Sequence, residues 1–254
     1  MRARSRYKSA QGEGSRLRIV QIAGRAEQGM HRPFRCRAEN DQWYYVKGAS
    51  VGFHGLRAEW IAGRLAELLD LPIPPFEIVQ IPAPLLDLLA PADQADLGTG
   101  SCFASSLMPE ASDFRYADLS EVSDELKVKT LLFDWWICNI DRILGPQGGN
   151  PNLIWSEQPR ELFLIDHNCA FSPDSELMES FATNHVFAQS YLWWQHYGKA
   201  LRAPMRAGCD ELENLWQELP EDWTEYADDF PCERMEAVLR RCESKEFWKL
   251  ERPQ

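Results

Sequence analysis

Long apolar runs, paired cysteines and an excess of positive charge are all missing from this sequence. No stretch of its 254 residues approaches the roughly 20 consecutive apolar residues of a membrane-spanning helix, and residues 1–18 lack the apolar segment of a signal peptide. The 7 cysteines are scattered without a Cys-x-x-Cys pair, which favours reduced, buried thiols over a disulfide framework or a zinc site. We therefore expect a cytoplasmic protein that does not bind membranes.

Negative charge dominates the residues that are present. Lys and Arg number 27 against 39 Asp and Glu, and the net charge of -12 repels nucleic-acid backbones. We therefore expect no direct nucleic-acid partner. With 44% hydrophobic and 11% aromatic residues, the chain can bury a large core, which excludes a disordered or fibrous protein.

Local patterns divide the chain into a short tail and two lobes. Basic and polar residues fill 1–16, which we expect to form a flexible tail. Apolar alternation and helical spacing then predict strands at 17–22, 34–38, 43–47, 76–81 and 102–108, and helices at 56–69, around 85–89 and at 123–139. Most of the last hundred residues have a helical pattern. We expect an α+β protein with an N-lobe at 17–108 and a helical C-lobe at 109–254.

Two carboxylates and a carboxamide follow predicted elements of the C-lobe. Asp141 comes after the helix at 123–139, Asn150 and Asn152 precede an apolar segment, and Asp166 ends the apolar strand Leu162–Ile165. This set suits phosphoryl transfer, in which one Asp orients the attacking hydroxyl while the Asn and the second Asp hold Mg²⁺ on the phosphates. Each residue taken alone could instead cap a turn.

The N-lobe offers a cation for the same chemistry. Lys47 closes the hydrophobic strand Trp43–Lys47, where it could reach nucleotide phosphates, and Glu59 lies early in the next helix, where it could pair with that lysine. A lysine at the end of a strand is more often simply solvated. The Gly24–Gly29 segment lies where a loop covering phosphates would be, although two glycines are also typical of an ordinary turn.

Five ordered segments resemble the HipA-like kinases, in particular their short stand-alone branch. The segments read YYVKG, EWIAGRLAELLDLPIPP, WICNIDR, NPNLIW and LFLIDHNCAF, and the likeness spans residues 17–171. The resemblance implies a bilobal protein-kinase-like fold with an antiparallel-sheet N-lobe and a mainly helical C-lobe. It also implies a kinase that uses ATP and Mg²⁺ to phosphorylate a hydroxyl, and we expect Ser or Thr of a protein as the acceptor.

The resemblance also assigns roles to residues. Lys47 would contact the ATP phosphates with Glu59 as its partner, and Asp141 would be the catalytic base, next to Arg142 of the catalytic loop. Leu107 and Met108 lie in the segment 103–109 that looks like the adenine-binding hinge.

The metal ligands that the resemblance implies are Asp166 and an asparagine. Asn150 and Asn152 follow Asp141 by nine and eleven positions, whereas kinases of this type place the asparagine about five positions after the Asp. An inserted loop could absorb the difference, and we favour Asn152 slightly because it directly precedes Leu153.

Two other functions stay open at this point. The stretched loop after Asp141 favours a pseudokinase or a nucleotide-binding interaction module, although a chain that had lost transfer would have no reason to keep Lys47, Asp141 and Asp166 together. A hydrolase that uses Asp166, His167 and a cysteine such as Cys169 is less favoured. Adjacent residues on a strand point to opposite faces, and Cys169 is better interpreted as packed. Besides ATP, we expect an unidentified phosphoacceptor, and an antitoxin-like or other protein partner remains open.

Overall fold

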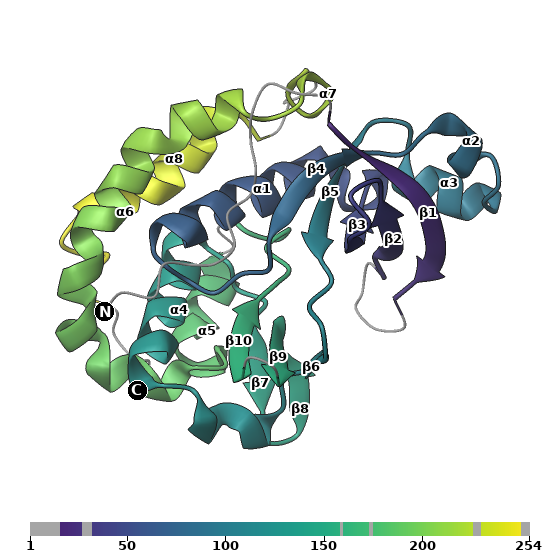
Figure 1. Cartoon of the computed structure of the whole chain (residues 1–254). Helices are drawn as coiled ribbons and strands as arrows, with labels where there is room; N and C mark the ends of the chain where they lie inside the picture. Colours follow the sequence, from purple (N-terminus) through teal and green to yellow (C-terminus); the bar gives the residue numbers. More distant parts are fainter. Residues whose placement is uncertain (1–15, 27–31, 158–159, 173–174, 226–229, 250–254) are drawn as a thin grey trace. The chain divides into compact units, whose positions relative to one another are not determined.

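Five strands from the first part of the chain close into a barrel in the computed structural model of this protein (Figure 1). Their order around the barrel is β1-β2-β3-β5-β4. The bounds are β1 (Leu17–Arg25), β2 (Phe34–Ala38), β3 (Trp43–Lys47), β4 (Phe76–Gln80) and β5 (Ser101–Ser106). All five strands were predicted from apolar alternation, with ends that differ by up to three residues.

The structure describes residues 16–26, 32–157, 160–172, 175–225 and 230–249. The chain forms two compact units, each built from several segments. The first unit comprises Met1–Trp60, Pro74–Pro109 and Leu219–Ala227, and the second comprises Ile61–Ile73, Glu110–Glu218 and Asp228–Gln254. Residues 1–15 of the predicted basic tail lie outside the described residues, whereas the guanidinium of Arg16 donates to Ser101 Oγ at 2.6 Å.

Closure of the barrel corrects the expectation of a purely antiparallel sheet. Four of the five strand pairings are antiparallel, but β1 and β4 pair in parallel, with Leu17 opposite Val79 and Arg18 opposite Gln80. Register shifts interrupt the β1–β2 ladder between Ile19 and Gln21 and again between Ile22 and Gly24. Such irregularities bend a strand. The first residues of β1 can therefore pair with β4, while its last residues pair with β2 alone.

The connection between β4 and β5 contains two short helices instead of the one predicted near 85–89. These are α2 (Ala83–Leu86) and α3 (Pro91–Leu97), and each has a proline in its first turn, where a missing N–H costs nothing. Leu86 and Leu97 are buried in the same apolar cluster as the inward-facing barrel residues Ile19 and Val46. The connection therefore contributes to the barrel core.

Helix α1 (Gly52–Leu68) confirms the helix predicted at 56–69 and follows a short 3₁₀ turn, η1 (Ala49–Val51). Its residues up to Trp60 belong to the first unit and the rest to the second. The Trp60 ring, in the middle of α1, meets the Phe76 ring of β4 edge to face, with centroids 5.1 Å apart, and this contact packs α1 against the barrel.

The second unit combines α4 (Asp124–Ile137) with a small antiparallel sheet in the order β10-β9-β6. Ser123 caps α4 by accepting from Leu126 N at 3.3 Å, and two acidic residues follow in the first turn, as a helix start favours. The remaining elements are β6 (Ala111–Asp113), η2 (Tyr116–Glu121), β7 (Ile143–Gly145), β8 (Gly148–Asn150), β9 (Leu153–Glu157), β10 (Arg160–Leu164), α5 (Ser175–Asn184), η3 (Ala188–Trp193), α6 (Trp194–Gln217), α8 (Cys232–Arg240) and η4 (Arg241–Glu243), with α7 (Glu221–Thr224) in the first unit.

Helix α4 is the centre of the second unit's core. Leu131, Leu132 and Phe133 are fully buried, and the buried Trp136 donates its indole N–H to the Leu239 carbonyl at 2.8 Å. Five of the seven cysteines are buried and Cys232 is half-buried. Cys169 is exposed, whereas we expected this thiol to be packed. Across the described ranges, no helix has both the length and the apolar character to cross a membrane.

Gly48, which directly follows Lys47, has no room for a side chain. A Cβ there would lie 2.1 Å from the carbonyl oxygen of Leu97 at the end of α3. We expect Gly48→Ala to lower the free energy of unfolding by about 1–3 kcal/mol, because backbone must move to relieve the clash. Urea denaturation measures this, with the exposed Ser50→Ala as a control that changes stability by less than about 0.5 kcal/mol. Equal stabilities of the two variants would contradict this packing.

Candidate active site

Lys47 and Glu59 form a buried ion pair in the first unit. Lys47 ends β3, and its Nζ lies 2.5 Å from Glu59 Oε1 on α1. The two side chains are only 10% and 2% exposed. Lys47 is therefore not the solvated strand-end lysine that its sequence position most often indicates. Breaking a buried ion pair by removing one partner typically costs about 3–5 kcal/mol.

The predicted hinge residues lie beside the strand that carries Lys47. The Leu107 amide donates to the Trp43 carbonyl at 2.8 Å, which continues the β3–β5 pairing beyond the end of β5. Met108 is buried with 8% of its surface exposed.

The loop that carries Asp141 begins where α4 ends at a left-handed residue. Cys138 has φ 54°, and the Asn139 amide donates back to the Asp134 carbonyl at 2.8 Å. A residue in this conformation stops a helix and reverses the chain direction. The turn places Asp141 four residues beyond the end of α4, as a half-buried residue outside any regular element.

A hairpin takes up the extra residues between Asp141 and Asn152. Strands β7 and β8 pair with Ile143 opposite Asn150 and Gly145 opposite Gly148. Asn150 is thus an exposed hairpin residue. Asn152 is buried, with φ 48°, and its Nδ2 donates to Asp141 Oδ2 at 2.8 Å. Of the two candidate asparagines, the structure brings Asn152 to Asp141.

The β9–β10 ladder brings Asp166 to the same place. Leu153 pairs with Leu164, and the Ile165 amide donates to the Asn152 carbonyl at 3.0 Å, so the ladder extends by one bond. Asp166 follows with φ 59°, a left-handed conformation that Asn and Asp adopt more readily than most residues. Asp141, Asn152 and Asp166 therefore come together in the structure.

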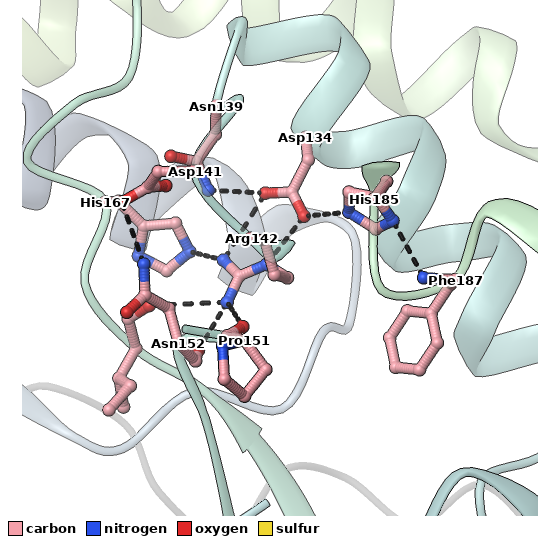
Figure 2. A network of polar contacts seen from close by, with 10 residues as sticks. Asp134, Asn139, Asp141, Arg142, Pro151, Asn152, His167, His185 and Phe187 are labelled. Atoms are coloured by element: carbon pink, nitrogen blue, oxygen red, sulfur yellow. Dashed lines mark hydrogen bonds and ion pairs between the residues drawn. The ribbon is translucent and has the colours of Figure 1, made fainter. Parts of the chain in front are cut away.

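Arg142 is buried beneath the catalytic loop and is not exposed to a ligand. Its side chain is fully buried, and its Nε donates to Asp134 Oδ2 at 2.7 Å (Figure 2). Other nitrogens of the guanidinium donate to the carbonyls of Pro151 and Asn152 and to His167 Nε2. The structure thus places Arg142 beneath the loop as an anchor, whereas the sequence grouped it with the catalytic residues.

Sequence reasoning did not single out Asp134 and His185. Asp134 lies in the last turn of α4 and is fully buried, and His185 Nε2 is 3.0 Å from its Oδ2. Burial would raise the pKa of the Asp134 carboxyl, but Arg142 and His185 outweigh it and hold that pKa well below its usual range. An acidic residue at an otherwise apolar helix position was the signal available for Asp134. His185, more than fifty residues along the chain, left no local signal.

Asp141 has an unusual electrostatic position. Burial raises the pKa of its carboxyl to about 6, and the negative charges of Asp166 and Asp134 add to this, while Arg142 and the Asn152 hydrogen bond oppose it. Its Oδ1 is buried and, among the described residues, has no hydrogen-bond partner. One oxygen is therefore held by Asn152, and the other is available to accept a proton.

Oxygen atoms are the ligands that this site can offer to a metal. The described residues contain no group of three His, Cys, Asp or Glu side chains arranged to hold a metal ion. Asp141, Asn152 and Asp166 provide two carboxylates and a carboxamide. Such a set fits Mg²⁺, which usually binds through one or two carboxylates and takes its other ligands from water and substrate phosphates.

Comparison with known proteins places this chain among the kinases. The family model of the HipA-like kinases matches residues 19–251, and the chain belongs to that family. No curated protein matches it. Among solved structures, the proinflammatory kinase CtkA of Helicobacter pylori is similar with a TM-score of 0.49 and 9% identity, over 90% of this chain and 92% of that one. The FAT and kinase domain of CtTel1 is similar with a TM-score of 0.38 and 13% identity, over 89% of this chain and 22% of that one.

The raised pKa of Asp141 predicts that this residue destabilises the ligand-free protein at neutral pH. The carboxyl pKa rises from 3.8 to about 6, so the ionised form costs up to about 3 kcal/mol above pH 6. We expect Asp141→Asn to be more stable than the wild type at pH 7.5, with a difference that shrinks as the pH falls through 6 towards 4.

Urea denaturation in EDTA-containing buffer at several pH values measures this difference. Asp113→Asn, at an exposed position of the same unit, is the control and should change stability by less than about 0.5 kcal/mol. A wild-type protein more stable than Asp141→Asn at pH 7.5 would show that the Asp141 carboxylate is better solvated than the structure indicates.

Proposed function

We propose that the protein is an ATP- and Mg²⁺-dependent kinase that transfers the γ-phosphate to a Ser or Thr hydroxyl of a protein. The observation that carries this proposal is the Asp141 carboxylate. Asn152 holds one of its oxygens, and the other is buried with no partner in the part of the chain that the structure describes. A general base needs this combination of a fixed orientation and one free acceptor atom. Membership in the HipA-like kinase family supports the same reaction class.

Asp141 is the proposed base. Its Oδ1 accepts the proton of the acceptor hydroxyl as the hydroxyl oxygen forms its bond to the γ-phosphorus. The bond between that phosphorus and the β,γ-bridging oxygen breaks, and ADP leaves with its electron pair. A pKa of about 6 makes this carboxylate a stronger proton acceptor than an ordinary Asp, while it remains mostly ionised at neutral pH.

Asn152 and Asp166 are the proposed metal ligands, and Asn150 is not, because it lies in the hairpin β8. Bound there, Mg²⁺ would neutralise phosphate charge during transfer. The hydrogen bond from Ile165 N to the Asn152 carbonyl holds the two ligand-bearing segments together, so the chain presents both oxygens without a large rearrangement. The contact between Asn152 and Asp141 links the metal ligands to the base.

Lys47 is the proposed phosphate-binding residue of the first unit, and Glu59 positions it. The ion pair holds the lysine in one orientation, which lowers the entropy lost when an anionic ligand binds. The Leu107 amide already donates to Trp43, so the proposed adenine contacts are the Leu107 carbonyl and the Met108 amide. We place the reaction in the cytoplasm, where ATP is available. An antitoxin-like partner has no support among the described residues.

The alternative of a pseudokinase rested on the long spacing between Asp141 and its asparagine. The hairpin of β7 and β8 accommodates that spacing, and Asn152 still reaches Asp141. This geometry supports an active kinase over a nucleotide-binding module without transfer.

Mg-ATP should stabilise the folded protein. At a ligand concentration 100-fold above its dissociation constant, the gain is about 2.7 kcal/mol, or roughly 5–10 °C in the melting temperature of a chain of this size. The matched control is Lys47→Met/Glu59→Gln, which removes both charges of the ion pair together. We expect this double variant to fold and to lose most of the shift. A folded wild type without any shift would refute the proposed nucleotide binding.

The two carboxylates should have separable roles. Asp141→Asn should abolish phosphate transfer and leave Mg-ATP binding largely intact, because the base acts on the acceptor hydroxyl. Asp166→Asn should lose both, because the metal loses a ligand. Calorimetric titration with Mg-ATP and transfer from γ-labelled ATP to proteins of a cell lysate measure the two properties. Wild-type binding without transfer to any acceptor would favour the pseudokinase, and equal binding losses in both variants would contradict the division of roles.

A further inference from the structure

Asp134 is saturated with hydrogen-bond donors. A carboxylate offers about four acceptor positions, two on each oxygen. Oδ1 accepts from Asn139 Nδ2 at 2.8 Å and from Arg142 Nη2 at 3.4 Å. Oδ2 accepts from Arg142 Nε at 2.7 Å and from His185 Nε2 at 3.0 Å (Figure 2). All four positions are therefore filled, and the carboxylate can adopt only one orientation.

Arg142 is saturated in the same way. A guanidinium has five N–H donors. Besides its two bonds to Asp134, it donates from Nη2 to His167 Nε2 at 3.2 Å and from Nη1 to the carbonyls of Pro151 and Asn152. The Ile165 carbonyl lies 3.4 Å from the same Nη1. Arg142 thus fixes the backbone of Asn152 and of Ile165, the residue before Asp166. Asn152 and Asp166 are the two proposed metal ligands.

Within the described ranges, His185 is the one side-chain donor to Asp134 that comes from outside the catalytic loop. It follows α5, in the part of the chain after Asp166. The Phe187 amide donates to His185 Nδ1 at 3.1 Å, so Nδ1 is the acceptor and Nε2 carries the proton given to Asp134. Backbone contacts also join the segment around His185 to the catalytic loop. The Val186 amide donates to the Arg142 carbonyl at 3.0 Å, and Ile143 forms an isolated β-bridge with His185.

We propose that Asp134 and His185 are positioning residues for the metal site, acting through Arg142 on Asn152 and Asp166. This inference rests on the proposed function and extends it to residues that touch neither nucleotide nor metal. Without the His185 N–H, one acceptor position of Asp134 Oδ2 is unfilled, and Asn139 and Arg142 alone hold the carboxylate. A less firmly held carboxylate fixes the guanidinium less well, and with it the Asn152 and Ile165 carbonyls to which Arg142 donates. The segment after α5 is thereby coupled to the metal ligands.

Two isosteric substitutions test the coupling, because they keep different halves of the imidazole. The amide of His185→Gln extends as far as Nε2 and can still donate to Asp134, whereas the shorter amide of His185→Asn extends only to Nδ1 and can replace only the contact with Phe187. We expect His185→Asn to raise the Mg²⁺ concentration for half-maximal ATP binding about 10- to 100-fold, as outer-shell partners of a metal site typically do. His185→Gln should stay close to the wild-type value.

Mg²⁺ titration at fixed ATP, followed by calorimetry, provides the readout. Met205→Ala, which removes a fully buried side chain of α6 outside this network, controls for a general loss of stability and should leave the Mg²⁺ dependence unchanged. Equal Mg²⁺ dependence of His185→Asn and the wild type, or equal losses in the Asn and Gln variants, would overturn the inference alone. A wild-type protein that binds no Mg-ATP would instead overturn the proposed function, and the inference with it.

Discussion

A buried arginine that must satisfy all its donors is the constraint on which the candidate site depends. Arg142 has no exposed surface, so every N–H without a partner would cost free energy that water cannot restore. The chain meets this demand by directing the Asp134 carboxylate and several backbone carbonyls at one guanidinium. Segments far apart in the sequence are thereby fixed relative to one another before any ligand binds. Preorganisation of this kind is what electrostatic catalysis requires.

The site also contains energetically unfavourable backbone and side-chain features, which the hydrogen bonds around Arg142 offset. Cys138, Asn152 and Asp166 all have left-handed backbone conformations, which cost of order 1 kcal/mol or more outside glycine. Asp141 adds a buried oxygen without a described partner and a carboxyl whose ionisation is disfavoured. Such features persist only where the surroundings over-determine them. Their concentration around Asp141 is consistent with the catalytic role proposed for this region.

The sequence was informative where a property is local and less so where it depends on distant partners. Apolar alternation located β1–β5 and helical spacing located α1 and α4, because burial of one face dictates those patterns. The order of Lys47, Asp141 and Asp166 indicated the reaction class. Barrel closure through the parallel β1–β4 pair and the donor from His185 to Asp134 both depend on tertiary contacts, which no local pattern encodes.

The hairpin of β7 and β8 has a consequence for how related chains are recognised. Its two ends are tied, one through Arg142 and the other through Asn152, while its tip around Gly148 is exposed. The number of residues between the ends can therefore drift during evolution without moving the groups at the base. A search pattern that fixes the interval between aspartate and asparagine would overlook such chains, whereas one that allows a variable gap closed by an apolar strand would retrieve them.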